Sequence, residues 1–265
     1  MSDPGWPPWV SRPPSIDELV TDDGVPMESE RHRAQMNLLI ESLNLAWVHR
    51  RDFYCGGNMF LYYSALQAKK NDFRGPDVFV VLDTERRERK AWVMWEEDGK
   101  HPDVIIELTS ESTAAVDRGE KKRIYARVVN VPEYFIYDPL TGALEGYQLD
   151  IQRREYDLVA PGANGRYASH RLGLELGIWH GRHADCDGPW LRWYTPDGKL
   201  LSTPREAHAE AEARRAEAEA RRTEAEARRA EAEARRTEAE QRASDLAERL
   251  AAYERQFGKL PDDQR

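Results

Sequence analysis

The sequence predicts a mixed α/β domain followed by a long, separate C-terminal helix. Three observations predict this organisation: short apolar runs typical of buried strands, a strand–helix–strand order between residues 104 and 137, and a seven-residue repeat after residue 205. The chain has 265 residues, which is long enough for one substantial domain and an accessory element.

The first predicted element of the domain is an amphipathic helix over residues 28–47, whose apolar residues recur at three- and four-residue spacing. Three apolar runs follow that are typical of strands buried on both faces, at residues 78–82, 104–106 and 134–137. Residues 117–129 lie between the last two runs and have one apolar face. We therefore expect a crossover helix that joins two parallel strands.

Short strands separated by turns are expected after Asp138, and Pro196-Asp197-Gly198 predicts the turn of a hairpin within residues 191–200. Between them, His180, His183 and Cys186 have a spacing that could ligate zinc. No second ligand pair accompanies them at a standard spacing, so an ordinary surface loop is the favoured interpretation. The glycines of Gly56-Gly57-Asn58 are expected to form a turn rather than a phosphate cradle.

Composition divides the chain into four parts. Residues 1–23 are a proline-rich arm, expected to be disordered, and residues 24–204 are the folded domain. Residues 205–257 are the predicted long helix, and residues 258–265 a flexible tail.

The repeat EAEARRA/EAEARRT in the third part places Glu four residues before Arg, an order that stabilises helices. At 1.5 Å per residue this helix would be about 80 Å long. A coiled coil anchored by the large apolar residues within 246–257 is one interpretation, which would make the protein a homodimer or higher homo-oligomer. The other is a single solvated helix held by ion pairs.

Charge and hydropathy exclude several classes of protein. Lys and Arg total 39 against 48 for Asp and Glu, a net charge of −9 that disfavours a non-specific nucleic-acid coat. There is no apolar run long enough for a membrane span and no secretory signal at the N-terminus. The two cysteines, Cys55 and Cys186, cannot form a disulfide framework, so we expect reduced thiols in a cytoplasmic protein.

Two carboxylates at the ends of predicted buried strands are the main candidates for chemistry. Asp77 opens one strand and Glu107 closes another, where desolvation is costly unless a cation shares the site. Hard oxygen ligands of this kind suit Mg²⁺ or Mn²⁺. The following helix supplies Lys121 and Lys122, either of which could stabilise a developing phosphoryl charge. This combination is typical of phosphodiester hydrolysis.

The sequence resembles the Uma-two family of restriction endonucleases, part of the PD-(D/E)XK nuclease superfamily. The resemblance covers roughly residues 23–204 and is carried by four segments: PD at 76–77, PDVIIELTS at 102–110, DRGEKK at 117–122 and VPEYFIYDP at 131–139. It implies a restriction-endonuclease-like mixed sheet flanked by helices. It also implies a metal-dependent DNA endonuclease in which Asp77 and Glu107 bind the metal.

The superfamily lysine would lie two residues after Glu107, where this chain has Thr109. The resemblance therefore points to Lys121 as the catalytic lysine, displaced to the next helix, with Lys122 second. Glu30, on the first helix, would complete the site.

Simpler interpretations stand beside these. Asp77 could only terminate a turn, the two lysines could belong to a solvated face, and Asp103 is expected to be structural because it opens its strand at the far end from Glu107. Two other functions follow from such interpretations. One is a catalytically inactive DNA- or protein-binding module, and the other an interaction protein whose long helix mediates assembly.

Overall fold

A mixed six-stranded sheet forms the centre of the domain in this computed structural model, which describes residues 12–21, 29–69 and 75–258. Its strands, in spatial order, are β1 (Phe53–Gly56), β3 (Val78–Leu82), β5 (Val104–Leu108), β6 (Glu133–Tyr137), β7 (Leu144–Asp150) and β8 (Glu155–Val159). The three predicted apolar runs are confirmed as β3, β5 and β6. Neighbouring strands are antiparallel except β5 and β6, which are parallel.

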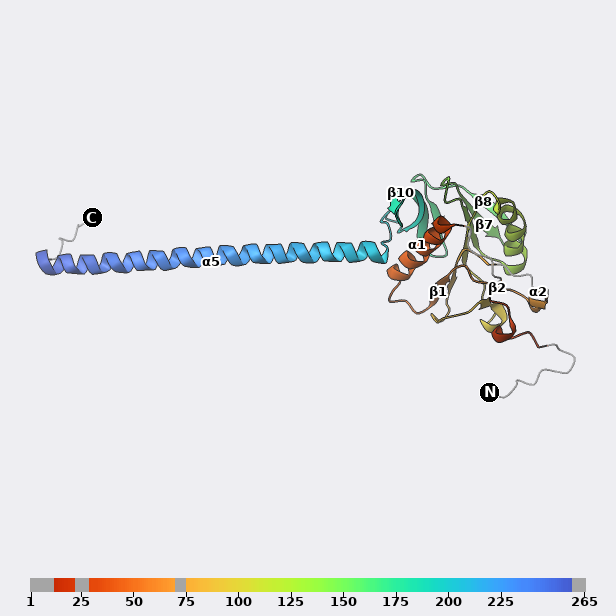
Figure 1. Ribbon diagram of the computed structural model, residues 1–265, viewed down its shortest axis with the longest axis horizontal. Helices are drawn as coiled ribbons and strands as arrows, with labels where there is room; N and C mark the ends of the chain where they lie inside the picture. Colours follow the sequence, from red (N-terminus) through yellow and green to blue (C-terminus); the bar gives the residue numbers. More distant parts are fainter. Residues whose placement is uncertain (1–11, 22–28, 70–74, 259–265) are drawn as a thin grey trace. The chain divides into compact units, whose positions relative to one another are not determined.

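The parallel pair is joined by the predicted crossover helix, which runs over residues Ala114–Val129. It consists of α3 (Ala114–Val116), the π-helical turn η3 (Asp117–Lys121), α4 (Lys122–Ile124) and a second π-helical turn, η4 (Tyr125–Val129). The helix ends at Asn130, whose left-handed backbone (φ 62°) turns the chain into β6. Figure 1 shows β7 and β8 beside this helix.

The other face of the sheet is covered by α1 (Glu30–Ala46) and by a three-stranded sheet of β9 (Tyr167–Ser169), β10 (Leu174–His183) and β11 (Cys186–Tyr194). Ser29 caps α1, because its hydroxyl accepts a hydrogen bond from the His32 amide. The expected start at residue 28 lies outside the described residues. Successive side chains of β5 point to opposite faces of the sheet, and each face carries its own hydrophobic core. Ile106 packs toward α1, whereas Ile105 packs toward the crossover helix.

Two predictions for the C-terminal half of the domain need correction. The stretch with His180 and His183 is not a loop but the tip of the β10–β11 hairpin, closed by Ala184 and Asp185 with positive φ angles of 48° and 61°. His180 and His183 are three residues apart in a strand, so their side chains leave opposite faces of the hairpin.

The predicted turn at Pro196–Gly198 exists, with the Gly198 amide donating to the Thr195 carbonyl. The segment after it returns as a single bridge between Leu200 and Tyr194 rather than as a strand. The hairpin prediction is therefore only partly right, because β11 takes β10 as its partner over nine residue pairs.

A small outer layer contains β2 (Leu61–Tyr62), which pairs with β4 (Trp92–Val93), together with α2 (Ala65–Lys69), η1 (Ile16–Glu18) and η2 (Met94–Glu96). Residues 12–21 of the proline-rich arm pack here: the Trp95 indole donates to the Pro14 carbonyl and the Ile16 amide to Glu96. Residues 1–11, 22–23 and the tail from 259 lie outside the described part of the chain.

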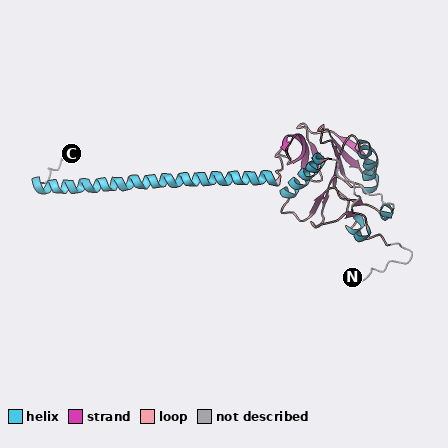
Figure 2. Cartoon of the chain, in the orientation of Figure 1, coloured by secondary structure: helices cyan, strands magenta, loops and turns pink. Residues whose placement is uncertain are grey.

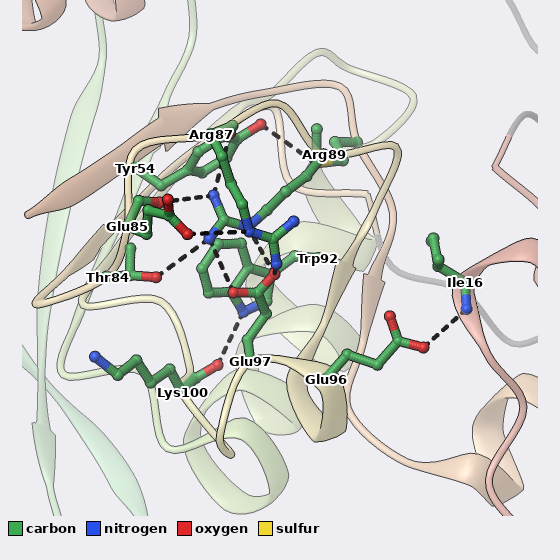
Figure 3. Close-up of polar contacts among 11 residues, drawn as sticks. Ile16, Tyr54, Thr84, Glu85, Arg87, Arg89, Trp92, Glu96, Glu97 and Lys100 are labelled. Atoms are coloured by element: carbon green, nitrogen blue, oxygen red, sulfur yellow. Dashed lines mark hydrogen bonds and ion pairs between the residues drawn. The ribbon is translucent and has the colours of Figure 1, made fainter. Parts of the chain in front are cut away.

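A buried ion pair within this layer packs against Tyr54 of β1 in the central sheet (Figure 3). The Arg89 guanidinium bonds both carboxylate oxygens of Glu97, at 2.7 and 2.9 Å, and lies over the rings of Tyr54 and Trp92. Its side chain is 2% exposed and that of Glu97 is 9% exposed. The bidentate contact and the aromatic faces together satisfy a charge that would otherwise be costly to bury.

The C-terminal unit is one helix, α5 (Pro204–Phe257), drawn in cyan in Figure 2. Glu–Arg pairs at the predicted four-residue spacing line it, for example Glu217–Arg221 and Glu224–Arg228. Among the described helices, none has both the length and the apolar character to cross a bilayer.

Candidate functional site

The register of β3 on β5 brings the two predicted carboxylates together. Val78 pairs with Ile106, so the preceding Asp77 faces Glu107, and both lie on the face that the crossover helix covers. The Asp77 amide lies 3.4 Å from Glu107 Oε2, and Asp77 Oδ2 accepts a 2.7 Å hydrogen bond from the Leu108 amide. Glu107 is fully buried and Asp77 half-buried.

The crossover helix adds a lysine to these carboxylates. Lys121 Nζ lies 3.0 Å from Glu107 Oε2 and 3.0 Å from Asp117 Oδ1. Lys122 points elsewhere, with its ammonium 3.5 Å from the centre of the Tyr147 ring. Of the two lysines considered, Lys121 is therefore the one that contacts the carboxylates.

Two members of the cluster were not assigned from the sequence, Asp117 and Tyr125. Asp117 shares the Lys121 ammonium, and the Tyr125 hydroxyl donates a 2.9 Å hydrogen bond to Glu107 Oε1. The signal that could have found them is their spacing, since each lies one turn of helix from Lys121. We refer to Asp77, Glu107, Asp117, Lys121 and Tyr125 as the carboxylate–lysine cluster.

A π-helical turn explains how the side chains of Asp117, Lys121 and Tyr125 all lie on one face of the crossover helix. In a regular α-helix, residues eight apart are rotated about 80° past alignment, because each residue advances about 100°. A π-turn bonds each residue to the fifth one along and so needs more residues for a full rotation. The π-turn η3, between Asp117 and Lys121, therefore offsets the drift and keeps these side chains directed toward Glu107.

Burial dominates the electrostatics of the cluster. Desolvation raises the pKa of Glu107 to about 8, against the attraction of Lys121, and it also raises the pKa of Asp77. Desolvation acts to lower the pKa of Lys121, but Glu107 and Asp117 outweigh it, so the net shift is upward. Three carboxyl groups lie around one ammonium, so ionisation of all three would leave the cluster short of positive charge.

This deficit, together with the oxygen donors, suits a hard divalent cation. Within the described residues no three His, Cys, Asp or Glu side chains are arranged to hold a metal. Asp77 and Glu107 offer two carboxylates. That number is enough for Mg²⁺, which commonly binds one or two protein carboxylates and keeps several water molecules as its other ligands. By this chemistry the residues fit Mg²⁺ or Mn²⁺.

The remaining candidates lie apart from the cluster. Glu30 is exposed at the first position of α1, and no contact joins it to the cluster among the described residues. Thr109 is buried, and its amide donates to the Tyr137 carbonyl. Asp103 accepts hydrogen bonds from the Leu82 amide and from Arg171, at the opposite end of β5 from Glu107.

Comparison with known proteins relates this chain to a family model and to a solved structure. A family model, Uma2, described as "Putative restriction endonuclease", matches residues 18–185. A crystal structure of a "putative nuclease belonging to DUF820" from Anabaena variabilis ATCC 29413 matches at 15% sequence identity with a TM-score of 0.37, covering 50% of this chain and 69% of that chain. Curated proteins give no match. The segment matched by the family model contains the whole carboxylate–lysine cluster and ends before α5.

Proposed function

This chain belongs to the Uma2 family of restriction-endonuclease-like proteins, and we propose that it is a Mg²⁺- or Mn²⁺-dependent DNA endonuclease that acts through Asp77, Glu107 and Lys121. The observation that carries the proposal is the position of the Lys121 ammonium, 3.0 Å from a buried carboxylate whose strand neighbour is Asp77. An acid from each of two strands and a lysine from the next helix are the groups that phosphodiester hydrolysis needs.

Asp77 and Glu107 would hold the divalent ion. Such an ion, when bound, supplies a Lewis acid for the phosphate and makes water a better nucleophile. The chain's own contacts prepare both ligands: the Leu108 amide fixes Asp77, and the Tyr125 hydroxyl fixes Glu107. Their orientation is therefore set before any ligand arrives.

Lys121 would act as a fixed positive charge. Since its neighbours raise its pKa, the ammonium stays protonated at neutral pH and is poorly suited to be a general base. Its role would be to stabilise negative charge that develops on the phosphoryl oxygens. Asp117, on the other side of the ammonium, would hold it in place.

The test is a nicking assay on supercoiled plasmid with Mg²⁺ or Mn²⁺, and with EDTA as the blank. Asp77→Asn, Glu107→Gln and Lys121→Met should each lower the rate by roughly a hundredfold or more, the scale of losing one preorganised electrostatic group. Lys90→Met is the matched control, because it removes an exposed lysine of the outer layer whose ammonium pairs with Asp17, away from the cluster.

Equal nicking by the wild type and the three site variants would refute the assignment. A wild type that binds DNA but cleaves none with either metal would instead identify an inactive binding module. We further propose that α5 joins copies of this chain into a homodimer or higher homo-oligomer, because its last turns expose Leu246, Leu250 and Tyr253.

A further inference from the structure

A basic cavity lies on the outer side of the crossover helix, where it faces the β7–β8 turn. Its volume is about 280 Å³. Five basic side chains line it: Arg118, Lys122, Arg123, Arg127 and Arg154. Arg118 directly follows Asp117 of the carboxylate–lysine cluster, but the side chains of adjacent helical residues point in different directions, so the cavity and the cluster lie on different sides of the same helix.

The cavity carries an excess of positive charge. Arg118 pairs with Glu145 at 2.6 Å, and Arg127 pairs with Glu155 at 2.5 Å. Arg123 and Arg154 are exposed, and neither forms an ion pair within the described residues. Five cations thus face two carboxylates.

That excess stands against the charge of the surrounding protein. Residues 205–265 carry 14 basic and 16 acidic residues, a charge of −2, so the −9 of the whole chain leaves −9 + 2 = −7 for residues 1–204. The acidic domain already has a large net charge to keep it in solution. A local net charge of about +3 would instead attract an anion to this cavity.

Gly119 is an independent sign that something approaches this surface. It lies inside the helix, where glycine is less favourable than alanine. Packing does not require it, because an added Cβ would meet no other atom within 4 Å. The residue lines the cavity and leaves the helix backbone open on that side. Close approach by a ligand would account for a glycine at this position.

We propose that this cavity binds successive phosphates of the DNA backbone, an inference that rests on the DNA substrate proposed above. Arginine forks match phosphate oxygens, and four of the five basic residues are arginines. From Arg118 to Arg127 the helix rises about 14 Å, which corresponds to about four phosphates of one strand when measured along the duplex axis. A strand bound here would run along the helix that carries Lys121.

Salt-dependent binding of a labelled DNA duplex by the full chain, in EDTA, tests the proposal without cleavage. The double variant Arg123→Ala/Arg154→Ala should flatten the plot of log K against log salt by roughly two units, since each phosphate contact contributes about 0.9. Arg51→Ala/Arg87→Ala is the matched control, because those arginines line a second cavity that includes Cys55 and Glu88. Its slope should equal that of the wild type.

Gly119→Leu supplies a second measurement that leaves every charge in place. Its side chain would enter the cavity, so DNA binding should weaken at least about tenfold while the melting temperature does not fall, because leucine is a better helix former. Unchanged binding by either cavity variant, equal loss of slope in both double variants, or a wild type that does not bind DNA would overturn the inference.

Failure of the proposed catalysis looks different. In that case the cavity variants still alter DNA binding in EDTA, whereas the wild type nicks nothing when metal is added. The reverse result, nicking that depends on Glu107 with no effect of the cavity variants on binding, would remove this cavity and leave the endonuclease.

Discussion

At the scale of single residues, Gly57 controls the position of Asp77. A Cβ at Gly57 would lie 2.0 Å from the Asp77 carbonyl oxygen and 3.2 Å from Ile40 Cδ1. The first of these is a backbone atom, which cannot turn aside as a side chain can. The turn that the sequence indicated at residues 56–58 therefore brings two backbone segments into contact beside the metal-binding candidate.

We predict that Gly57→Ala displaces Asp77 and lowers nicking by at least about tenfold, because small misplacements of reacting groups have large effects on rate. Overpacking should also cost about 1–3 kcal/mol of unfolding free energy, measured by urea denaturation. Gly75→Ala is the control: it lies two residues before Asp77, and its Cβ would meet Phe60 at an ordinary 3.5 Å. A Gly57→Ala protein with wild-type rate and stability would contradict the prediction.

The sequence predicted Asp77, Glu107 and Lys121 as candidates, and the structure brings these three together. The reason is local: polar residues at the ends of apolar strands are unusual whatever their partners. Asp117 and Tyr125 were not predicted as site residues, because a charged or aromatic residue is common on an amphipathic helix. Their alignment on one face depends on the π-turn η3, which no residue pattern in the chain indicates.

At the scale of elements, the buried Arg89–Glu97 pair stabilises the outer layer and packs it against Tyr54 of β1. Arg89→Ala would leave Glu97 with the 47% exposed Arg87 as its ion-pair partner and would remove the cation from the faces of Tyr54 and Trp92. We expect a loss of about 3–5 kcal/mol in unfolding free energy, as for other broken buried pairs. Chemical denaturation measures it.

Arg87→Ala is the internal comparison, because Arg87 bonds the same Glu97 oxygen but is 47% exposed. It should cost about 0.2–1 kcal/mol, the range of surface pairs. Similar losses in the two variants would show that burial does not set the strength of this pair.

Strands could be predicted from the sequence where their apolar residues form an unbroken run. Runs of apolar residues placed β3, β5 and β6, and the long connection with a helical pattern between β5 and β6 made their parallel pairing the natural expectation. The β10–β11 hairpin was missed because its tip, from His180 to Asp187, is polar on both faces. The position of such a strand is set by its pairing with the neighbouring strand over nine residue pairs. The local composition of the sequence does not encode this pairing.

At the scale of the whole molecule, α5 has two parts with different chemistry. The repeat region is held by its own Glu–Arg pairs, and its stripe of Ala and Thr offers little area to a partner. Near the C-terminus, Leu246, Leu250 and Tyr253 follow at four- and three-residue spacing, with side chains 64%, 50% and 49% exposed. A seam of this spacing is typical of a coiled coil.

We predict that the full chain sediments as a homodimer or larger homo-oligomer and that the chain truncated after Pro204 sediments as a monomer. The pair Leu246→Ala/Leu250→Ala should also give a monomer, because it removes the apolar seam while keeping good helix formers. Thr223→Ala/Thr237→Ala is the matched control, since both threonines lie in the repeat and bond only to the carbonyl one turn before them. A full chain that sediments as a monomer, or an unchanged oligomer after truncation, would show that α5 is a single solvated helix and that assembly does not depend on it.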